Sequence, residues 1–205
     1  SDRTQLPDRD RTEVEELPEH LQVRIDETGT VSVLLAADSS GQGHQTLVSQ
    51  LLADELEILP SDIDVDYLDS VEAPTVYGSA ASRMAVMLSG ATAGIGTKLT
   101  DNIETLASNL WDCSSEDVSY RNGGVERAGT DQQLSIAELA AIDTDREPTE
   151  RLTHVSYNYD HPATEFEAFD EAFAEKFPVY PTAAFGANAP IVEVDINTGE
   201  IEILA

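Results

Sequence analysis

The chain has 205 residues, of which 40 are Asp or Glu and only 11 are Lys or Arg, so its formal net charge is −29. This balance argues against nucleic-acid binding through the surface, because phosphate contacts need Lys and Arg. Hydrophobic residues make up 40% of the chain, and the acidic residues are spread between them rather than gathered in one block. The composition therefore favours a folded protein with an acidic surface over a disordered acidic tail.

The charge has two possible explanations, of which we favour the first. A high-salt cytoplasm would screen the self-repulsion of an acidic surface, whereas a cationic partner would neutralise it. The first residues do not resemble a secretory signal peptide, and no apolar stretch approaches the length of a membrane span. We therefore expect a halophilic, soluble protein of the cytoplasm that has no membrane partner.

The chain begins with a charged segment and two strands. Residues 1–19 carry ten charged side chains and two prolines, which predicts a flexible arm outside a single domain that spans residues 20–205. Residues 21–25 alternate as a half-buried strand. After a turn at residues 26–29, residues 30–36 form a second strand.

A glycine loop between a strand and a helix is the candidate binding site. The run Gly41-Gln42-Gly43-His44 stands directly before a segment whose leucines recur at helical spacing. The first N–H groups of a helix have no partner inside it, and the helix dipole is positive at that end. The loop therefore favours a phosphate, although a tight turn that merely needs glycine is the simpler alternative.

An acidic strand follows this helix. Apolar residues at 63, 65 and 67 alternate with aspartates at 62, 64 and 66, which predicts a strand with one acidic face. A calcium loop is excluded, because Tyr67 stands where the turn glycine is needed and Ala73 where the bidentate glutamate is needed. Residues 70–83 then form a loop.

A long helix is predicted next, because seven apolar residues recur three or four positions apart. Gly90, Gly94 and Gly96 lie within it and are expected to allow close packing against a neighbour. The run at residues 94–98 is not a P-loop, because lysine does not directly follow its last glycine. The apolar stripe consists of Leu88, Ala91, Ile95, Leu99, Ile103, Leu106 and Leu110.

The last part of the chain predicts short elements. Residues 118–134 form a polar hairpin, Ser135 caps a short helix through Glu138, and residues 152–159 form a strand. A hairpin closes the sequence. The single cysteine, Cys113, excludes an intrachain disulfide and is expected to be a small packed residue. Four phenylalanines at helical spacing are expected in the core or at an interface, namely Phe166, Phe169, Phe173 and Phe177.

The order of these motifs resembles the molybdenum-binding large subunit of the molybdenum hydroxylases, the family of xanthine dehydrogenase, aldehyde oxidase and aerobic carbon monoxide dehydrogenase. The motifs are the run at residues 41–46, the small-residue run at residues 77–83 before the long helix, and the aromatic-glycine segment at residues 184–188 before the final hairpin. The resemblance implies an α+β fold with mixed sheets and a long packed helix, as part of a molybdenum cofactor-binding domain.

The resemblance also implies a cofactor, molybdenum with molybdopterin in its cytosine dinucleotide form. Gln42 would bond near the molybdenum ligands or the pterin. The backbones of Gly43 and His44, with the hydroxyl of Thr46, would meet the phosphates. There are simpler alternatives to cofactor contact for two of these residues. His44 could form hydrogen bonds locally, and Arg83 could pair with a carboxylate at the surface. The implied cofactor-binding residues are Gly41, Gln42, Gly43, His44, Thr46, Ala81, Ser82 and Arg83.

By the same resemblance, the protein would oxidise or hydroxylate an aldehyde, a purine-like heterocycle or carbon monoxide with water. Its partners would be iron–sulfur and flavin subunits within a complex that forms a homodimer. The family's catalytic glutamate lies downstream of the matching region, and an earlier cofactor motif lies upstream. We therefore expect an internal piece that is inactive without the remainder of the large subunit, with no catalytic and no metal-ligating residue of its own. The alternative is a non-catalytic acidic assembly module that keeps the fold and lacks a complete site.

Overall fold

The computed structural model describes residues 18–69, 71–74, 76, 78–79, 82–160 and 189–204. It confirms the expected α+β fold, with mixed and antiparallel sheets and a long packed helix. The elements are β1 (Glu19–Ile25), β2 (Val31–Leu35), α1 (His44–Leu56), β3 (Ile63–Tyr67), α2 (Met84–Trp111), β4 (Val118–Arg121), β5 (Gly124–Arg127), β6 (Gln133–Ser135), α3 (Ile136–Asp143), β7 (His154–Tyr159), β8 (Val192–Val194) and β9 (Ile201–Ile203). Short 3₁₀ turns lie at Pro60–Asp62, Ser115–Asp117 and Pro148–Glu150.

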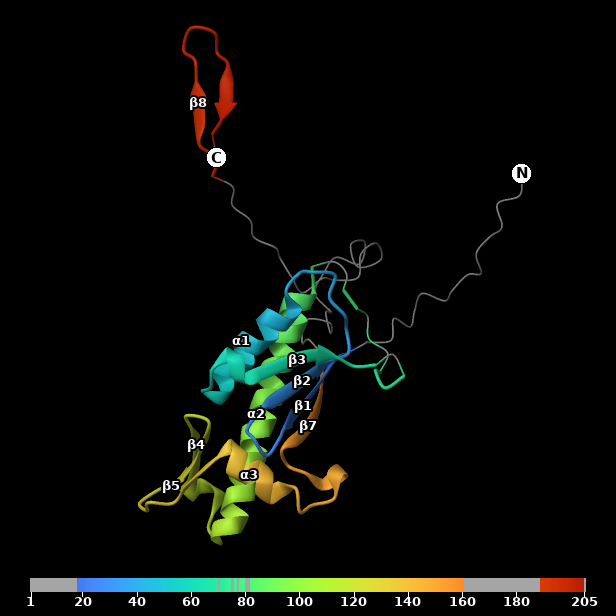
Figure 1. Ribbon diagram of the computed structural model, residues 1–205, viewed down its shortest axis with the longest axis vertical. Helices are drawn as coiled ribbons and strands as arrows, with labels where there is room; N and C mark the ends of the chain where they lie inside the picture. Colours follow the sequence, from blue (N-terminus) through green and yellow to red (C-terminus); the bar gives the residue numbers. More distant parts are fainter. Residues whose placement is uncertain are drawn as a thin grey trace, which may run out of the picture.

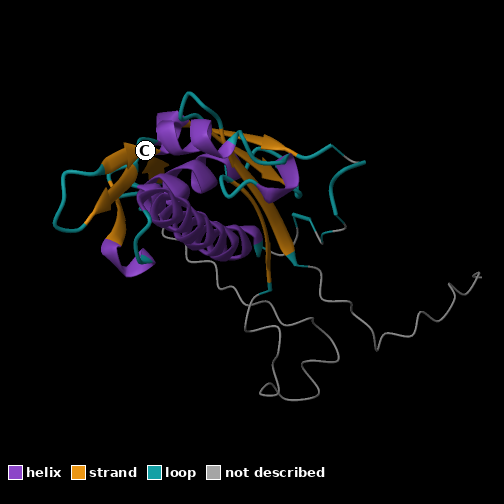
Figure 2. Ribbon diagram, turned by 90° about the horizontal axis from the view of Figure 1, so that it is seen from below, coloured by secondary structure: helices purple, strands orange, loops and turns teal. Residues whose placement is uncertain are grey.

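The main sheet has the order β3-β2-β1-β7. β1 runs antiparallel to β2 and β7, and β2 runs parallel to β3 across the α1 connection. Leu21, Val23 and Ile25 are buried while the residues between them are more exposed, because successive side chains of a strand point to opposite faces. The helices α1 and α2 lie side by side against the buried face (Figure 1). Figure 2 shows α2 almost along its axis, with the sheet to one side.

Two residues differ from the sequence predictions. Glu19, which was assigned to the flexible arm, begins β1 and is fully buried, because the two-residue period places it on the same face as Leu21. Residues 1–17 lie outside the described residues. Leu110, predicted as the last residue of the apolar stripe, is 49% exposed, because Trp111 packs on the core in the final turn of α2. The other six stripe residues are buried as predicted.

The glycines of α2 allow the close packing that the sequence predicted. Gly90 lies directly under the ring of Tyr159, and Gly94 lies under the ring of Tyr157, both on β7. A Cβ atom at either glycine would overlap the tyrosine ring. Gly96 faces the side chain of Glu55 on α1 in the same way. These contacts bring α2 close to both β7 and α1.

A Gly94→Ala variant tests this packing. Alanine normally stabilises an exposed helix interior by about 1 kcal/mol relative to glycine. Here we expect a loss of about 1–2 kcal/mol in the free energy of unfolding, because the ring of Tyr157 must move away. Urea unfolding measures the difference. In a Tyr157→Ala background the same substitution should be neutral or stabilising, whereas stabilisation in both backgrounds would contradict the packing.

A second sheet lies near the C-terminal end of α2, with the order β4-β5-β6 (Figure 1). It contains the predicted polar hairpin with its turn at Asn122 and Gly123, and β6 adds a third strand. The predicted cap of α3 is confirmed: the Glu138 N–H donates to Ser135 Oγ at 3.3 Å, and the Ser135 N–H donates to Glu138 Oε2 at 2.9 Å. This end of the molecule is opposite the loops that precede α1 and α2.

The remaining predictions concern the end of the chain. The final hairpin is confirmed as the antiparallel pair β8–β9. Cys113 is half-buried and packs against the core just after α2. The four phenylalanines at 166–177 and the aromatic-glycine segment at 184–188 lie outside the described residues. No helix in the described part of the chain is long and apolar enough to cross a membrane.

Candidate cofactor-binding site

The two loops singled out in the sequence meet at one cavity. Gln42 Nε2 donates a hydrogen bond to Ser79 Oγ at 3.0 Å, and Ser79 Oγ donates to the carbonyl oxygen of Asp38 at 3.0 Å. These bonds tie the loop before α1 to the loop before α2 beside an open cavity of about 370 Å³. The described residues that line it are Gln42, His44, Leu47, Ser79, Ser82, Arg83, Met84 and Ala85.

The glycine loop needs its glycines for backbone conformation. Gly41 has φ +100° and Gly43 has φ +79°, backbone angles that residues other than glycine rarely adopt. Apart from the adjacent residues in the chain, no described atom lies within 4 Å of the place where a Cβ atom would stand at either residue. Gln42 Oε1 closes the turn by accepting a bond from the Ser40 N–H at 2.6 Å. The tight-turn interpretation thus holds, and the same turn leaves open space beside its backbone.

The N-terminus of α1 presents donors to the cavity. Gly43 precedes the helix, no side chain caps it within the described residues, and the first turn contains no acidic residue. The His44 side chain is 3% exposed and lines the cavity, and neither of its ring nitrogens has a hydrogen-bond partner among the described residues. Buried polar atoms without partners are uncommon and costly. Local side-chain bonding of His44, the alternative considered from the sequence, is not observed among the described residues.

The second loop contributes a cation. Arg83 Nη1 donates to the carbonyl oxygen of Gly78 at 3.3 Å and lies 3.8 Å from Glu19 Oε2. Their side chains are 11% and 0% exposed, so this is a largely buried ion pair rather than a surface pair. The neighbouring Ser82 has φ +58°, a backbone conformation that costs energy for a residue other than glycine. Strain of this kind is common where a loop is shaped for binding.

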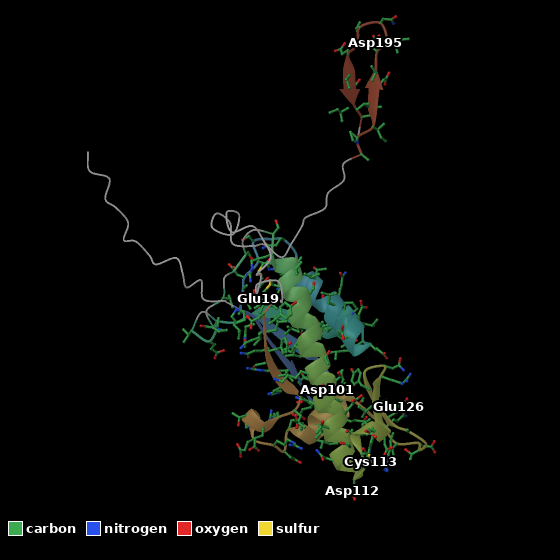
Figure 3. The ribbon with its side chains drawn as sticks, turned by 180° about the vertical axis from the view of Figure 1, so that it is seen from behind. Glu19, Asp101, Asp112, Cys113, Glu126 and Asp195 are labelled. Atoms are coloured by element: carbon green, nitrogen blue, oxygen red, sulfur yellow. The ribbon has the colours of Figure 1, made fainter. Side chains whose placement is uncertain are left out.

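Glu19, the partner of Arg83 behind the cavity lining, is a residue that the sequence analysis did not connect with the site. Burial raises the pKa of its carboxyl group to about 7, and this effect outweighs the Arg83 charge and the His20 N–H, which lower that pKa. Neither carboxylate oxygen accepts a well-formed hydrogen bond within the described residues. The alternation of Glu19 with the apolar residues of β1 is the signal in the sequence that could have predicted its burial. Figure 3 shows Glu19 at the N-terminal end of α2, opposite Asp112 and Cys113.

Not every predicted residue reaches the cavity. Gln42, His44, Ser82 and Arg83 line it, and Gly41 and Gly43 lie in the loop beside it. Thr46 is exposed and is not among the lining residues, so its contact with a phosphate stays a prediction. Ala81 lies outside the described residues. The sequence did not single out the lining residues Leu47, Ser79, Met84 and Ala85 as part of the site.

The family of the chain follows from comparison with known proteins. Residues 5–205 match the family model of the molybdopterin cofactor-binding domain. The chain therefore belongs to this family, which confirms the resemblance seen in the order of its motifs. The match begins within the segment expected to be a separate arm.

Similar proteins include a subunit of a dehydrogenase complex and the large chain of a carbon monoxide dehydrogenase. The chain is 31% identical over 183 residues to subunit gamma of the 6-hydroxypseudooxynicotine dehydrogenase complex of Paenarthrobacter nicotinovorans, covering 89% of this chain and 21% of that protein. It is 26% identical over 178 residues to the carbon monoxide dehydrogenase large chain of Afipia carboxidovorans, covering 87% and 20%. The chain thus spans about a fifth of the length of these relatives.

Solved structures agree with this assignment. The crystal structure of the Cu,Mo-CO dehydrogenase superposes with a TM-score of 0.63 at 26% identity, over 71% of this chain and 19% of that chain. Quinoline 2-oxidoreductase from Pseudomonas putida 86 superposes with a TM-score of 0.58 at 30% identity, over 70% and 19%.

Proposed function

We propose that the chain forms part of the binding site for molybdopterin cytosine dinucleotide, with the pyrophosphate of this cofactor at the N-terminus of α1. The observation that carries the proposal is that the loops before α1 and α2 meet at one cavity. The cofactor supplies the redox chemistry, while Gln42, the His44 backbone and Arg83 would bind and orient it.

The residues around the cavity fit an anion. The chain has 40 acidic residues, yet none of the described residues lining this cavity is acidic. The α1 N-terminus adds the positive end of its dipole and N–H groups that have no partner within the helix. Arg83 adds a guanidinium, which can bond two phosphate oxygens at once. Loop, helix end and cation together make the combination that phosphate groups commonly meet in proteins.

We further propose that the complete protein is an oxidoreductase that uses water to oxidise or hydroxylate an aldehyde, a heterocycle or carbon monoxide. Iron–sulfur and flavin subunits would accept the electrons, and the complex would form a homodimer in the cytoplasm. The support for this is the chain's similarity to subunits of a dehydrogenase complex and of carbon monoxide dehydrogenase.

The hairpin β8–β9 supports a role for the remainder of the large subunit. Its register places Val192 opposite Ile203 and Val194 opposite Ile201 on one face, and Glu193 opposite Glu202 on the other. The four apolar side chains are 46–72% exposed. A two-stranded hairpin with an uncovered apolar face is marginally stable in water. We propose that another part of the large subunit covers this face.

A Gln42→Ala variant of the complete subunit tests the proposed site. The loss of the bonds to Ser79 and Ser40 separates the two loops, so we expect about tenfold less molybdenum and pterin in the purified complex. Metal analysis and pterin fluorescence measure both. Gln45→Ala is the matched control, because Gln45 bonds the Val65 carbonyl on β3 at 2.9 Å and is not among the lining residues. Equal retention by both variants, or a wild-type complex without cofactor, would favour the assembly module.

A further inference from the structure

The carboxylate of Glu19 is buried next to Arg83, the cation that lines the cavity. Glu19 is 0% exposed, its oxygens have no well-formed hydrogen bond within the described residues, and Oε2 lies 3.8 Å from Nη1 of Arg83. Burying a charge costs free energy unless the charge is well paired. The distance between Arg83 and Glu19 is longer than that of a charge-assisted hydrogen bond. A buried polar group of this kind calls for an explanation in the native protein.

We propose that Glu19 is a positioning residue that acts through Arg83: it holds the guanidinium beside the cavity and takes up a proton when an anion binds there. The inference rests on the proposed function, since the anion is the pyrophosphate of the cofactor. Glu19 itself does not line the cavity, so it touches the anion only through Arg83.

Anion binding and protonation of Glu19 are coupled because the phosphate and the Glu19 carboxylate both interact with Arg83. Arg83 has several N–H donors, one of which is directed to the Gly78 carbonyl while the same nitrogen lies near Glu19. A phosphate at Arg83 repels the Glu19 carboxylate and offsets the attraction that keeps it ionised. The pKa of Glu19, already raised to about 7 by burial, must then rise further.

The sign of the pH dependence follows from this coupling. A neutral Glu19 no longer competes with the anion for the charge of Arg83, so affinity is highest below pH 7 and falls as the pH rises through that value. Among the described residues, the other titratable or charged groups around Glu19 and the cavity are Arg83 ahead of α2, His20 beside it on β1, Tyr159 opposite it on β7, and His44 at the start of α1. A variant at Glu19 alone leaves all of these in place.

The test is the binding of dicytidine pyrophosphate to the full chain, measured by calorimetry at pH 6 and pH 8. This probe carries a pyrophosphate diester that keeps its charge across the interval. For the wild type we expect Kd to rise by about threefold to tenfold, since a tenfold change corresponds to a pKa shift of one unit on binding. For Glu19→Gln we expect the same Kd at both pH values, close to that of the wild type at pH 6.

Two further variants complete the test. Glu126→Gln removes one negative charge from an exposed pair with Arg121 at the opposite end of α2, and should keep the wild-type pH profile (Figure 3). Arg83→Gln should weaken binding by about tenfold and flatten the profile, which provides a second test should Glu19→Gln not fold by circular dichroism.

The outcomes separate this inference from the proposed function. A wild-type chain that does not bind the probe overturns both. If Arg83→Gln abolishes binding but the Kd of the wild type does not change with pH, the role of Glu19 is overturned and the site remains supported. The same holds if the pH dependence of Kd persists in Glu19→Gln.

Discussion

A Gly43→Val variant of the complete subunit is expected to lose most of its bound molybdenum and pterin, by about tenfold or more. Gly43 has φ +79°, which costs a branched residue about 1–2 kcal/mol, and the new side chain would stand next to the His44 N–H at the helix end. Both effects act on the loop that supplies the proposed phosphate donors. Metal analysis and pterin fluorescence of the purified complex measure the loss.

Gly129→Val is the matched control for this prediction. Gly129 lies between β5 and β6, has φ +72°, and like Gly43 has no described atom, apart from the adjacent residues in the chain, within 4 Å of the place for a Cβ atom. The backbone penalty is therefore similar, but the residue is remote from the cavity. We expect Gly129→Val to retain the cofactor. Equal losses in the two variants would attribute the effect to general destabilisation instead of the site.

Leu99→Ala is expected to lower the free energy of unfolding by about 3 kcal/mol, within the range for leucines truncated in a packed core. Leu99 is 0% exposed at the centre of α2, between the two helices and the sheet. Leu110→Ala, in the last turn of the same helix, should cost less than about 1 kcal/mol, because Leu110 is 49% exposed. Urea unfolding of both variants in one buffer gives the comparison.

The leucine pair also distinguishes the structure from the sequence pattern. The apolar stripe alone predicts similar costs for the two substitutions, since both leucines belong to it. Similar measured losses would contradict the position of Leu110 on the surface and the packing of Trp111 in its place.

The fold was largely predictable because periodicity records which side of an element is buried. The two-residue period identified β1 and β3, and the three- and four-residue spacing identified α2 over almost its whole length. The period does not say where the core ends, so it misplaced Leu110. Composition assigned Glu19 to the charged arm, because a single charge that follows a run of charges is grouped with them. Its position in the strand is nevertheless buried.

The site was predictable only in part. Local spacing predicted that the α1 N-terminus carries donors, and the family resemblance added the loop before α2 to the same site. The bond between Gln42 and Ser79 and the pairing of Arg83 with Glu19 are tertiary contacts between distant segments, and no local pattern encodes them. The buried, unpartnered ring of His44 likewise becomes visible only when its surroundings are known.

A crystal structure of the assembled complex with its cofactor bound would test the proposed phosphate site most directly. We expect phosphate oxygens within hydrogen-bond distance of the His44 backbone N–H and of the Arg83 guanidinium. A cofactor bound elsewhere in the complex, without contact to the cavity between Gln42, His44 and Arg83, would rule this site out.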